Sequence, residues 1–277
     1  MNIFSKIVLG TVQFGCPYGI KKNKSLISKK EVFKILDLSW KFGVRSFDLS
    51  TSYGFATSRI FDWLKKNKLL KESNIIFKFK AEDDLSKVLY NNDFSQCKSL
   101  ILMSHGYVPE KFFFKKLEFV KNYEFITGQS IYELKEYNNL KKGKISRFQI
   151  PGNIFNFHLI NKIKKEKKFF DVRSIFLQGL ILNPEKIFDK KLQKLKFLIK
   201  YLEKNINIID FSFNFVLHRL KKEDRIVIGV DSINDLKDIN NINAIEHSTI
   251  NKLHSNLVNL NHFKMLSKYS YDPRRWL

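Results

Sequence analysis

The chain has 277 residues, 44% of them hydrophobic, so it is long enough and apolar enough to bury a sizeable core. Two cysteines, Cys16 and Cys97, are too few for a disulfide framework and lack the spacing of metal ligands. No apolar run is long enough to span a bilayer, and the first ten residues are too weakly apolar for a secretory signal. We therefore expect a cytoplasmic protein with neither a membrane partner nor a bound metal.

The formal net charge of +23 makes nucleic acid the first partner to consider. Of the 50 basic residues, however, 42 are lysines, and they are scattered along the chain. Proteins that bind nucleic acid more often concentrate arginine in one patch and interleave it with aromatic residues. The charge therefore indicates solvated lysine faces, and we expect no nucleic-acid partner.

Eight short apolar runs alternate with segments of helical spacing. In chain order the runs are 6–10, 45–48, 74–78, 99–105, 124–130, 147–151, 171–179 and 225–230. Helical candidates lie between them at 28–43, 56–70, 109–122 and 157–168, and two more fill the long gap before the last run, at 190–205 and 210–220. The first helix should be capped by Ser28 and Glu31, and one face should carry Val32, Ile35, Leu36 and Trp40.

This alternation predicts a parallel sheet covered by helices, and eight such units fit a closed (β/α)8 TIM barrel that spans 1–277 as a single domain. The alternative is an open, doubly wound sheet. Such a sheet normally binds a dinucleotide through a glycine-rich turn, and the sequence contains neither G-x-G-x-x-G nor a P-loop pattern.

Three successive runs end in side chains that suit proton chemistry, namely Asp48, Lys78 and His105, and Tyr53 lies in the loop after Asp48. In a barrel, these strand ends meet at the mouth where chemistry takes place. A tyrosine with a reference pKa of about 10 is a poor acid near neutrality, and we expect the Lys78 ammonium to lower that pKa. Asp48 would hold Lys78 charged, and His105 would orient a substrate carbonyl or share the proton.

At these residues the sequence resembles the aldo/keto reductases. The resemblance extends in order through "LGTVQFGCPYGI", "GVRSFDLSTSYG", "IIFKFK", "LILMSH", "QIPGNIFN", "RSIFLQGLIL", "IVIGVDSINDL" and "YDPRRW", and the "RSIFLQG" and "DPRRW" stretches look like a bacterial branch. The resemblance implies a catalytic tetrad of Asp48, Lys78, His105 and the proton donor Tyr53. It also implies an NAD(P)H-dependent reductase that converts an aldehyde or ketone, with a sugar-derived carbonyl as one option, into an alcohol.

The resemblance further implies how the nicotinamide dinucleotide is bound without a glycine fingerprint. Ser130 and Gln149 would hold the nicotinamide amide, and Ser232 with a helix N-terminus would take the adenosine 2′-phosphate. The full set of expected cofactor contacts is Gly10, Thr11, Gln13, Ser130, Gln149, Arg173, Ser174, Phe176, Ser232, Lys237, Asn240 and Asn241.

We expect NADP(H) rather than NAD(H), although Asp231 beside Ser232 is unfavourable to a 2′-phosphate. The alternative function is a regulatory barrel that binds the cofactor and has little turnover. The sequence specifies neither the carbonyl substrate nor the oligomeric state.

Overall fold

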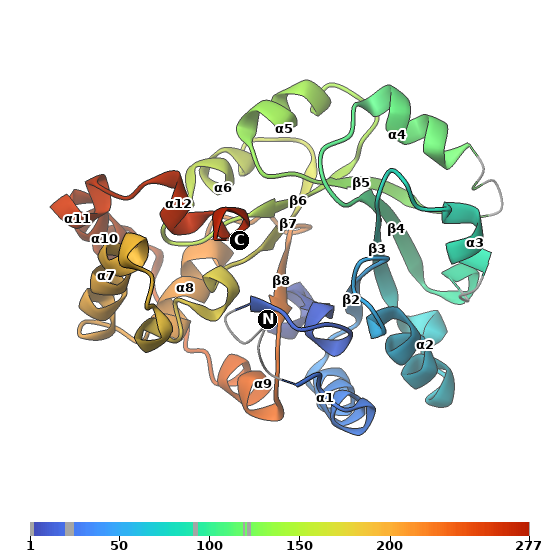
Figure 1. Cartoon of the computed structure of the whole chain (residues 1–277), viewed down its shortest axis with the longest axis horizontal. Coiled ribbons are helices and arrows are strands. Elements are labelled where there is room, and N and C mark those ends of the chain that lie inside the picture. The colour runs from blue at the N-terminus through green and yellow to red at the C-terminus, as the bar shows by residue number, and fades with distance from the viewer. Residues whose placement is uncertain (1–2, 20–24, 91–93, 119, 121–122, 277) are drawn as a thin grey trace.

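Eight parallel strands close into one barrel (Figure 1), in a computed structural model that describes residues 3–19, 25–90, 94–118, 120 and 123–276. Each strand pairs with the next along the chain, and β8 pairs with β1. The strands are β1 Ile7–Gly10, β2 Ser46–Ser50, β3 Asn74–Phe79, β4 Ser99–Ser104, β5 Ile126–Ser130, β6 Arg147–Pro151, β7 Phe169–Arg173 and β8 Arg225–Gly229. The predicted TIM barrel is confirmed, and the doubly wound alternative is excluded.

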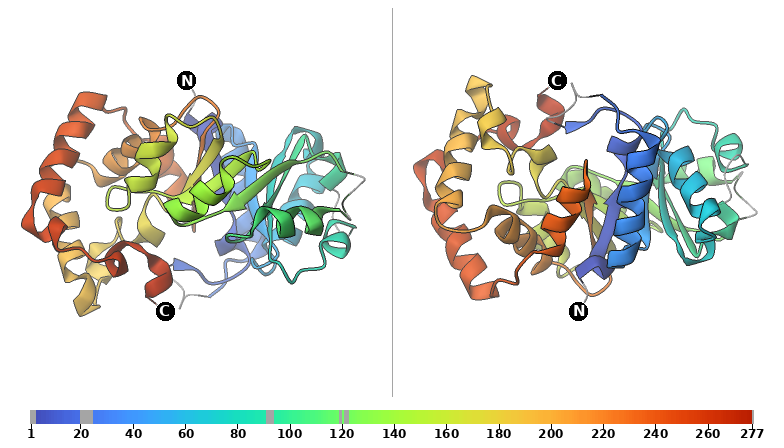
Figure 2. Two further views of the ribbon diagram at one scale, coloured as in Figure 1. Left: turned by 90° about the horizontal axis from the view of Figure 1, so that it is seen from above. Right: turned by 90° about the horizontal axis from the view of Figure 1, so that it is seen from below.

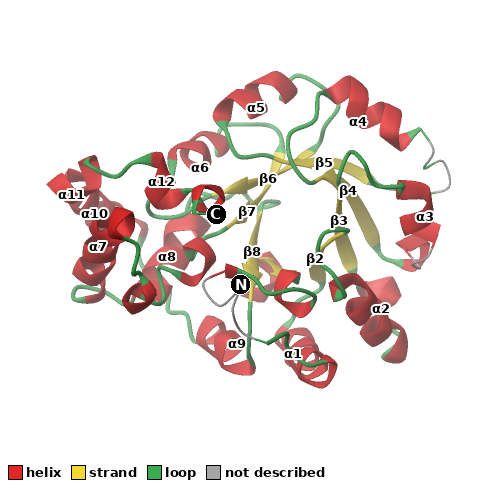
Figure 3. Cartoon of the chain, in the orientation of Figure 1, coloured by secondary structure: helices red, strands yellow, loops and turns green. Residues whose placement is uncertain are grey.

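Helices surround the strands (Figure 3) and are α1 Lys29–Phe42, α2 Ala56–Lys66, α3 Leu85–Tyr90, α4 Glu110–Leu117, α5 Leu134–Leu140, α6 His158–Ile163, α7 Gln193–Glu203, α8 Ile208–Leu217, α9 Ile233–Asn240, α10 His247–Asn259, α11 Asn261–Lys264 and α12 Lys268–Tyr271. Each predicted helix is present, in most cases a few residues shorter than expected, and residues 119, 121 and 122 of the 109–122 prediction lie outside the described chain. The described helices include none that is long and apolar enough to cross a membrane.

The run predicted at 171–179 is a strand only as far as Arg173. Ser174, Leu177 and Gln178 have φ angles of 62°, 49° and 54°, which no strand accommodates. Residues 177–179 instead form a single 3-10 turn. The chain thus bends sharply at the mouth of the barrel, and the following residues line its upper end.

The extra helices before β8 pack with those after it. Helix α7 contacts α8 and α11, and α10 contacts α8 and α11. Figures 1 and 2 show this group gathered on one side of the barrel, away from α2, α3 and α4.

The first helix illustrates how local sequence sets these elements. The Ser28 hydroxyl accepts a hydrogen bond from the Glu31 amide at 3.2 Å, as the N-cap prediction required. Val32, Ile35 and Leu36 are fully buried, and the Trp40 ring packs edge-on against Trp63. The helix therefore buries the face that its apolar spacing predicted.

Strand alternation turns one set of side chains, partly polar and partly apolar, into the barrel and packs the other, apolar set against the helices. In β6, Arg147 and Gln149 point inward, whereas Phe148 and Ile150 belong to the main core. A small separate cluster fills part of the interior with Val8, Ile76, Ile101, Met103 and Val227.

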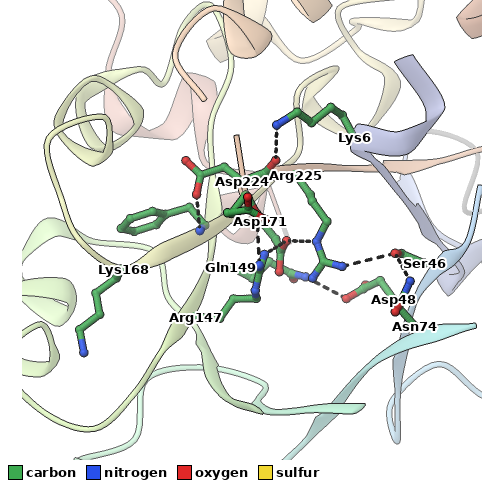
Figure 4. Close-up of polar contacts among 12 residues, drawn as sticks. Lys6, Ser46, Asp48, Asn74, Arg147, Gln149, Lys168, Asp171, Asp224 and Arg225 are labelled. Atoms are coloured by element: carbon green, nitrogen blue, oxygen red, sulfur yellow. Dashed lines mark hydrogen bonds and ion pairs between the residues drawn. The ribbon is translucent and has the colours of Figure 1, made fainter. Parts of the chain in front are cut away.

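A buried charge cluster lies deeper in the barrel, where β6 and β8 begin (Figure 4). Asp171 Oδ1 accepts hydrogen bonds from Arg147 Nη1 at 2.7 Å and from Arg225 Nε at 3.0 Å. The Asp171 side chain is fully buried, and the two arginine side chains are 10% and 15% exposed. The single negative charge of Asp171 therefore balances the positive charges of two guanidinium groups that are largely shielded from water.

Asp171→Asn should lower the free energy of unfolding by about 3–5 kcal/mol, because it leaves two buried cations without a counter-charge. Urea denaturation measures this loss. The matched control is Asp62→Asn, which breaks the exposed pair with Lys29 and should change the same quantity by less than about 1 kcal/mol. Equal effects of the two substitutions would contradict the role given to the buried cluster.

Candidate active site

Three side chains from separate strands form a closed hydrogen-bonded triangle inside the barrel. Lys78 Nζ donates to Asp48 Oδ2 at 2.8 Å and to Gln149 Oε1 at 2.9 Å, and Gln149 Nε2 donates to Asp48 Oδ1 at 2.8 Å. All three residues are at most 2% exposed. The triangle satisfies both carboxylate oxygens, so it fixes an ion pair rigidly in a dry site.

Two glycines position the loop that carries Tyr53. A Cβ on Gly15 would lie 1.7 Å from the Tyr53 carbonyl oxygen, and Gly54 has a φ of +51° with Gly15 O 2.3 Å from its own ideal Cβ. Neither position accommodates a side chain. The loops after β1 and β2 therefore lie backbone against backbone, which turns Tyr53 toward the triangle.

The Tyr53 phenol contacts the ion pair of Asp48 and Lys78. Its hydroxyl donates to Asp48 Oδ2 at 3.4 Å, the same oxygen that Lys78 contacts, and Lys78 Nζ lies 5.0 Å from the centre of the Tyr53 ring. The His105 ring stands edge-on to Tyr53 with centroids 5.8 Å apart. The four residues expected at one barrel mouth are thus brought together.

The expected direction of the Tyr53 pKa is wrong. Burial, together with the negative charge of Asp48, raises the pKa of Tyr53 well above its usual value of 10. The phenol hydrogen is directed at the carboxylate, so ionisation would place two anions side by side. Tyr53 is consequently a neutral phenol at physiological pH, which is the form that can donate a proton.

The charge of Lys78 is governed by two opposing effects. Burial lowers the pKa of Lys78, and the Asp48 carboxylate at 2.8 Å opposes that change. This opposition agrees with the expected role of Asp48, which is to hold an ammonium where water does not solvate it.

His105 is also shifted by burial, which with the Lys78 charge lowers the pKa of His105 to about 4. Its Nδ1 lies 3.1 Å from Ser50 Oγ. Because the imidazole is neutral at physiological pH, it can orient a carbonyl oxygen but holds no extra proton to transfer.

The free energy of unfolding should fall as pH drops from about 7 to 4. His105 and His254 both have a pKa lowered from 6.5 to about 4, so the unfolded chain binds more protons across this range. Each histidine should contribute roughly 1–3 kcal/mol, present above pH 6.5 and lost toward pH 4. Denaturant titrations at several pH values measure the slope, and His254→Gln should make it shallower; an unchanged slope would contradict the assignment.

A long cavity runs from the ion pair and Tyr53 across the ends of β7 and β8 to α9. It is lined by Asp48, Tyr53 and Lys78 at one end and by Asp235, Asp238 and Ile239 at the other. Of the expected cofactor contacts, five line this cavity: Gly10, Gln13, Arg173, Ser174 and Phe176.

The remaining expected contacts lie elsewhere or have other partners. Gln149 belongs to the buried triangle, and Thr11, which is fully buried, donates to the Asp48 main-chain oxygen at 2.7 Å. Ser130 is buried and does not line the cavity. Lys237, Asn240 and Asn241 are exposed around the end of α9 and do not line it either. Their contacts with a cofactor stay predictions.

At the α9 end, a carboxylate of the chain binds the main chain just before the helix. Asp235 Oδ2 accepts from the amides of Asp231 and Ser232 at 2.7 and 3.1 Å, and Ser232 Oγ accepts from the Asp235 amide at 3.2 Å. Asp231, Asp235 and Asp238 all line the cavity. The two amides just before α9 therefore bind the protein's own carboxylate, and three carboxylates surround the place where the sequence suggested a phosphate.

Two residues at the site were not identified from the sequence. Ser50, which contacts His105, lies two positions after Asp48 and so faces the same side of β2. Asp235 stands three residues after Ser232, the spacing of a capping box. Both residues could have been predicted from the sequence, Ser50 from the alternation of side chains along a strand and Asp235 from the capping-box spacing.

No protein-family model matches the sequence, and no curated protein matches it either. Solved structures do resemble the chain over most of its length. A glycerol dehydrogenase from Gluconobacter oxydans shares 10% identity at a TM-score of 0.70 and covers 91% of each chain. An aldo/keto reductase from Brucella melitensis shares 14% sequence identity at a TM-score of 0.61, and the match covers 91% of this chain and 93% of that one.

An aldo/keto reductase from Klebsiella pneumoniae, solved with NADP and acetate, shares 11% at a TM-score of 0.60 and covers 90% of this chain and 91% of its own. At these identities the similarity concerns the fold. The chain therefore shares the barrel fold of these solved structures, which is the fold that the sequence resemblance implied.

Proposed function

We propose that this chain is an NAD(P)H-dependent reductase that converts an aldehyde or ketone into an alcohol. The observation that carries the proposal is the convergence of the Tyr53 hydroxyl and the Lys78 ammonium on Asp48 Oδ2. A phenol beside a buried ion pair, at the catalytic mouth of a barrel, is suited to protonate an oxygen that gains negative charge.

In the proposed reaction, the carbonyl oxygen of the substrate binds beside the Tyr53 hydroxyl and the neutral His105 ring. As the carbonyl carbon accepts a hydride, Tyr53 transfers its proton to the oxygen. The phenolate that remains is stabilised by the Lys78 charge and is then reprotonated from solvent. Asp48 and Gln149 hold Lys78 in place and do not touch the substrate.

The long cavity suits a nicotinamide dinucleotide, which would supply the hydride. Gln13 Oε1 is buried without a hydrogen-bond partner among the described residues and lines the cavity beside Gly229. An amide or hydroxyl of a bound ligand would satisfy it. Gly10, Gln13, Ser174 and Phe176 are the residues we propose to hold the cofactor.

The adenosine end does not fit the expected NADP(H). A 2′-phosphate at the start of α9 would meet Asp231, Asp235 and Asp238, and Asp235 already binds the amides of Asp231 and Ser232 just before the helix. Carboxylates repel a phosphate, whereas an acidic residue hydrogen-bonds the ribose hydroxyls of NAD. We therefore propose NADH as the preferred cofactor.

Titration of the purified protein with NADH and with NADPH, followed by fluorescence, tests this proposal. NADH should bind at least about tenfold more tightly, one unfavourable charge contact being worth about 1.4 kcal/mol or more. A panel of aldehydes should then oxidise the bound cofactor, seen as loss of absorbance. Cofactor binding without turnover on any aldehyde would favour the regulatory alternative, and tighter binding of NADPH would refute the cofactor assignment.

A further inference from the structure

A second cavity lies beside the catalytic one, and the two share a wall formed by Tyr18, Arg173, Ser174 and Gln178. Its far side comes from the loop after β5 and from the C-terminal tail, through Tyr132 and Arg274. Figure 1 draws this tail in red, and Pro151 at the end of β6 lines the same cavity. A substrate that extends away from Tyr53 over the shared wall would enter this second cavity.

Arg173 is the charged group of the shared wall, and it forms no ion pair with any described residue. No carboxylate of the described residues lies within ion-pairing distance of it, and its Nη2 is enclosed without a hydrogen-bond partner. The acids of the second cavity are already engaged, since Glu133 pairs with Lys268 at 2.6 Å and Asp272 with Arg274 at 2.7 Å. An enclosed, unpaired guanidinium nitrogen is costly, and an oxyanion would relieve that cost.

The Arg173 guanidinium is held by stacking rather than by an ion pair. Its Cζ lies 4.2 Å from the centre of the Tyr132 ring, and Arg274 Cζ lies 3.7 Å from the same ring. Stacking occupies the face of the guanidinium and leaves its edge, which is the part that binds carboxylate and phosphate. Arg173 also lies close enough to Tyr53 for its charge to oppose the rise in pKa that burial causes.

We propose that Arg173 forms an oxyanion subsite, so that the substrate is an aldehyde or ketone that carries a carboxylate or phosphate group. The carbonyl would lie at Tyr53 while the acid group binds the edge of Arg173 and extends toward the second cavity. This proposal rests on the reductase function, whose substrate class it narrows, and it assigns Arg173 to the substrate rather than to the cofactor.

Calorimetric binding to the full chain without cofactor tests the subsite independently of turnover. The probes are 4-formylbenzoate against 4-formylbenzamide, and glyceraldehyde 3-phosphate against glyceraldehyde. At least one anion should bind about 10- to 100-fold more tightly than its neutral counterpart, the range expected for a hydrogen-bonded charge. Whichever pair shows the difference identifies the acid group. Equal affinities within both pairs, or no binding of any probe, would overturn the proposal.

Arg173→Leu should abolish the preference, and Lys135→Met, which removes an exposed charge from the same cavity, should preserve it. Arg173→Lys keeps the positive charge but loses the two-pronged guanidinium edge, so it should retain a weaker preference for anions. This variant replaces Arg173→Leu in the test if the leucine variant does not fold. If saturating NADH instead competes with the anion for Arg173, the guanidinium serves the dinucleotide and the subsite is refuted. If neutral and anionic aldehydes are reduced at equal kcat/KM, the oxyanion subsite is refuted and the reductase function stands. If anions bind in a way that depends on Arg173 but no aldehyde is reduced, the subsite stands and the reductase function is refuted.

Discussion

Tyr53→Phe should reduce carbonyl turnover by about 10²- to 10⁴-fold while leaving cofactor affinity within about threefold of the parent. The substitution removes only the hydroxyl, which is the proposed proton donor. That hydroxyl makes one long hydrogen bond of 3.4 Å, so the free energy of unfolding should change by less than about 1 kcal/mol. Single-turnover kinetics measure the chemical step, and fluorescence titration measures cofactor binding.

A suitable control for this change is Tyr18→Phe. Tyr18 also lines the catalytic cavity, but its hydroxyl accepts a hydrogen bond from Gln178 and none from the ion pair. It should therefore keep most of the turnover. If Tyr53→Phe retains the parent rate, or if the two variants are equally impaired, Tyr53 is not the proton donor and the mechanism must be abandoned.

The barrel was predictable because its eight apolar runs and their order are properties of local sequence. So was the grouping of Asp48, Lys78 and His105, since in a parallel barrel all strands end at the same mouth. The role of Gly54 was only partly visible. Its place after Tyr53 suggests a turn, whereas its contact with Gly15 depends on how two loops far apart in the chain meet.

Properties that depend on how deeply a side chain is buried, or on which strands face each other across the barrel, could not be predicted from the sequence. The pKa of Tyr53 rises because the partly buried ring lies next to Asp48, and the extent of its burial depends on the whole barrel. Gln149 contacts Asp48 from the opposite side of the barrel, four strands away in β6. The sequence resemblance assigns Gln149 to the cofactor, which stays a prediction, and the closed barrel adds its contacts with Lys78 and Asp48.

In the proposed mechanism the buried ion pair serves both the reaction and the stability of the fold, so the prediction for Lys78 concerns both quantities. Lys78→Met should abolish measurable reduction, because the phenolate formed at Tyr53 loses its nearby positive charge. It should also lower the free energy of unfolding by about 3–5 kcal/mol, since Asp48 is left buried without a cation. Urea denaturation and turnover assays on the same preparation measure the two effects.

Two companion variants separate the chemical role of Lys78 from its structural one. Asp48→Asn combined with Lys78→Met removes both charges and should recover much of the lost stability without recovering turnover, because the missing ammonium is what the reaction needs. Lys80→Met is the matched control: Lys80 lies two residues later, is half exposed and pairs only loosely with Glu82 at 3.8 Å, so its loss should leave both quantities nearly unchanged. Turnover in the charge-free double variant would show that the ion pair serves only the fold. Inactivity of Lys80→Met beside an active Lys78→Met would place the reacting lysine outside the barrel interior.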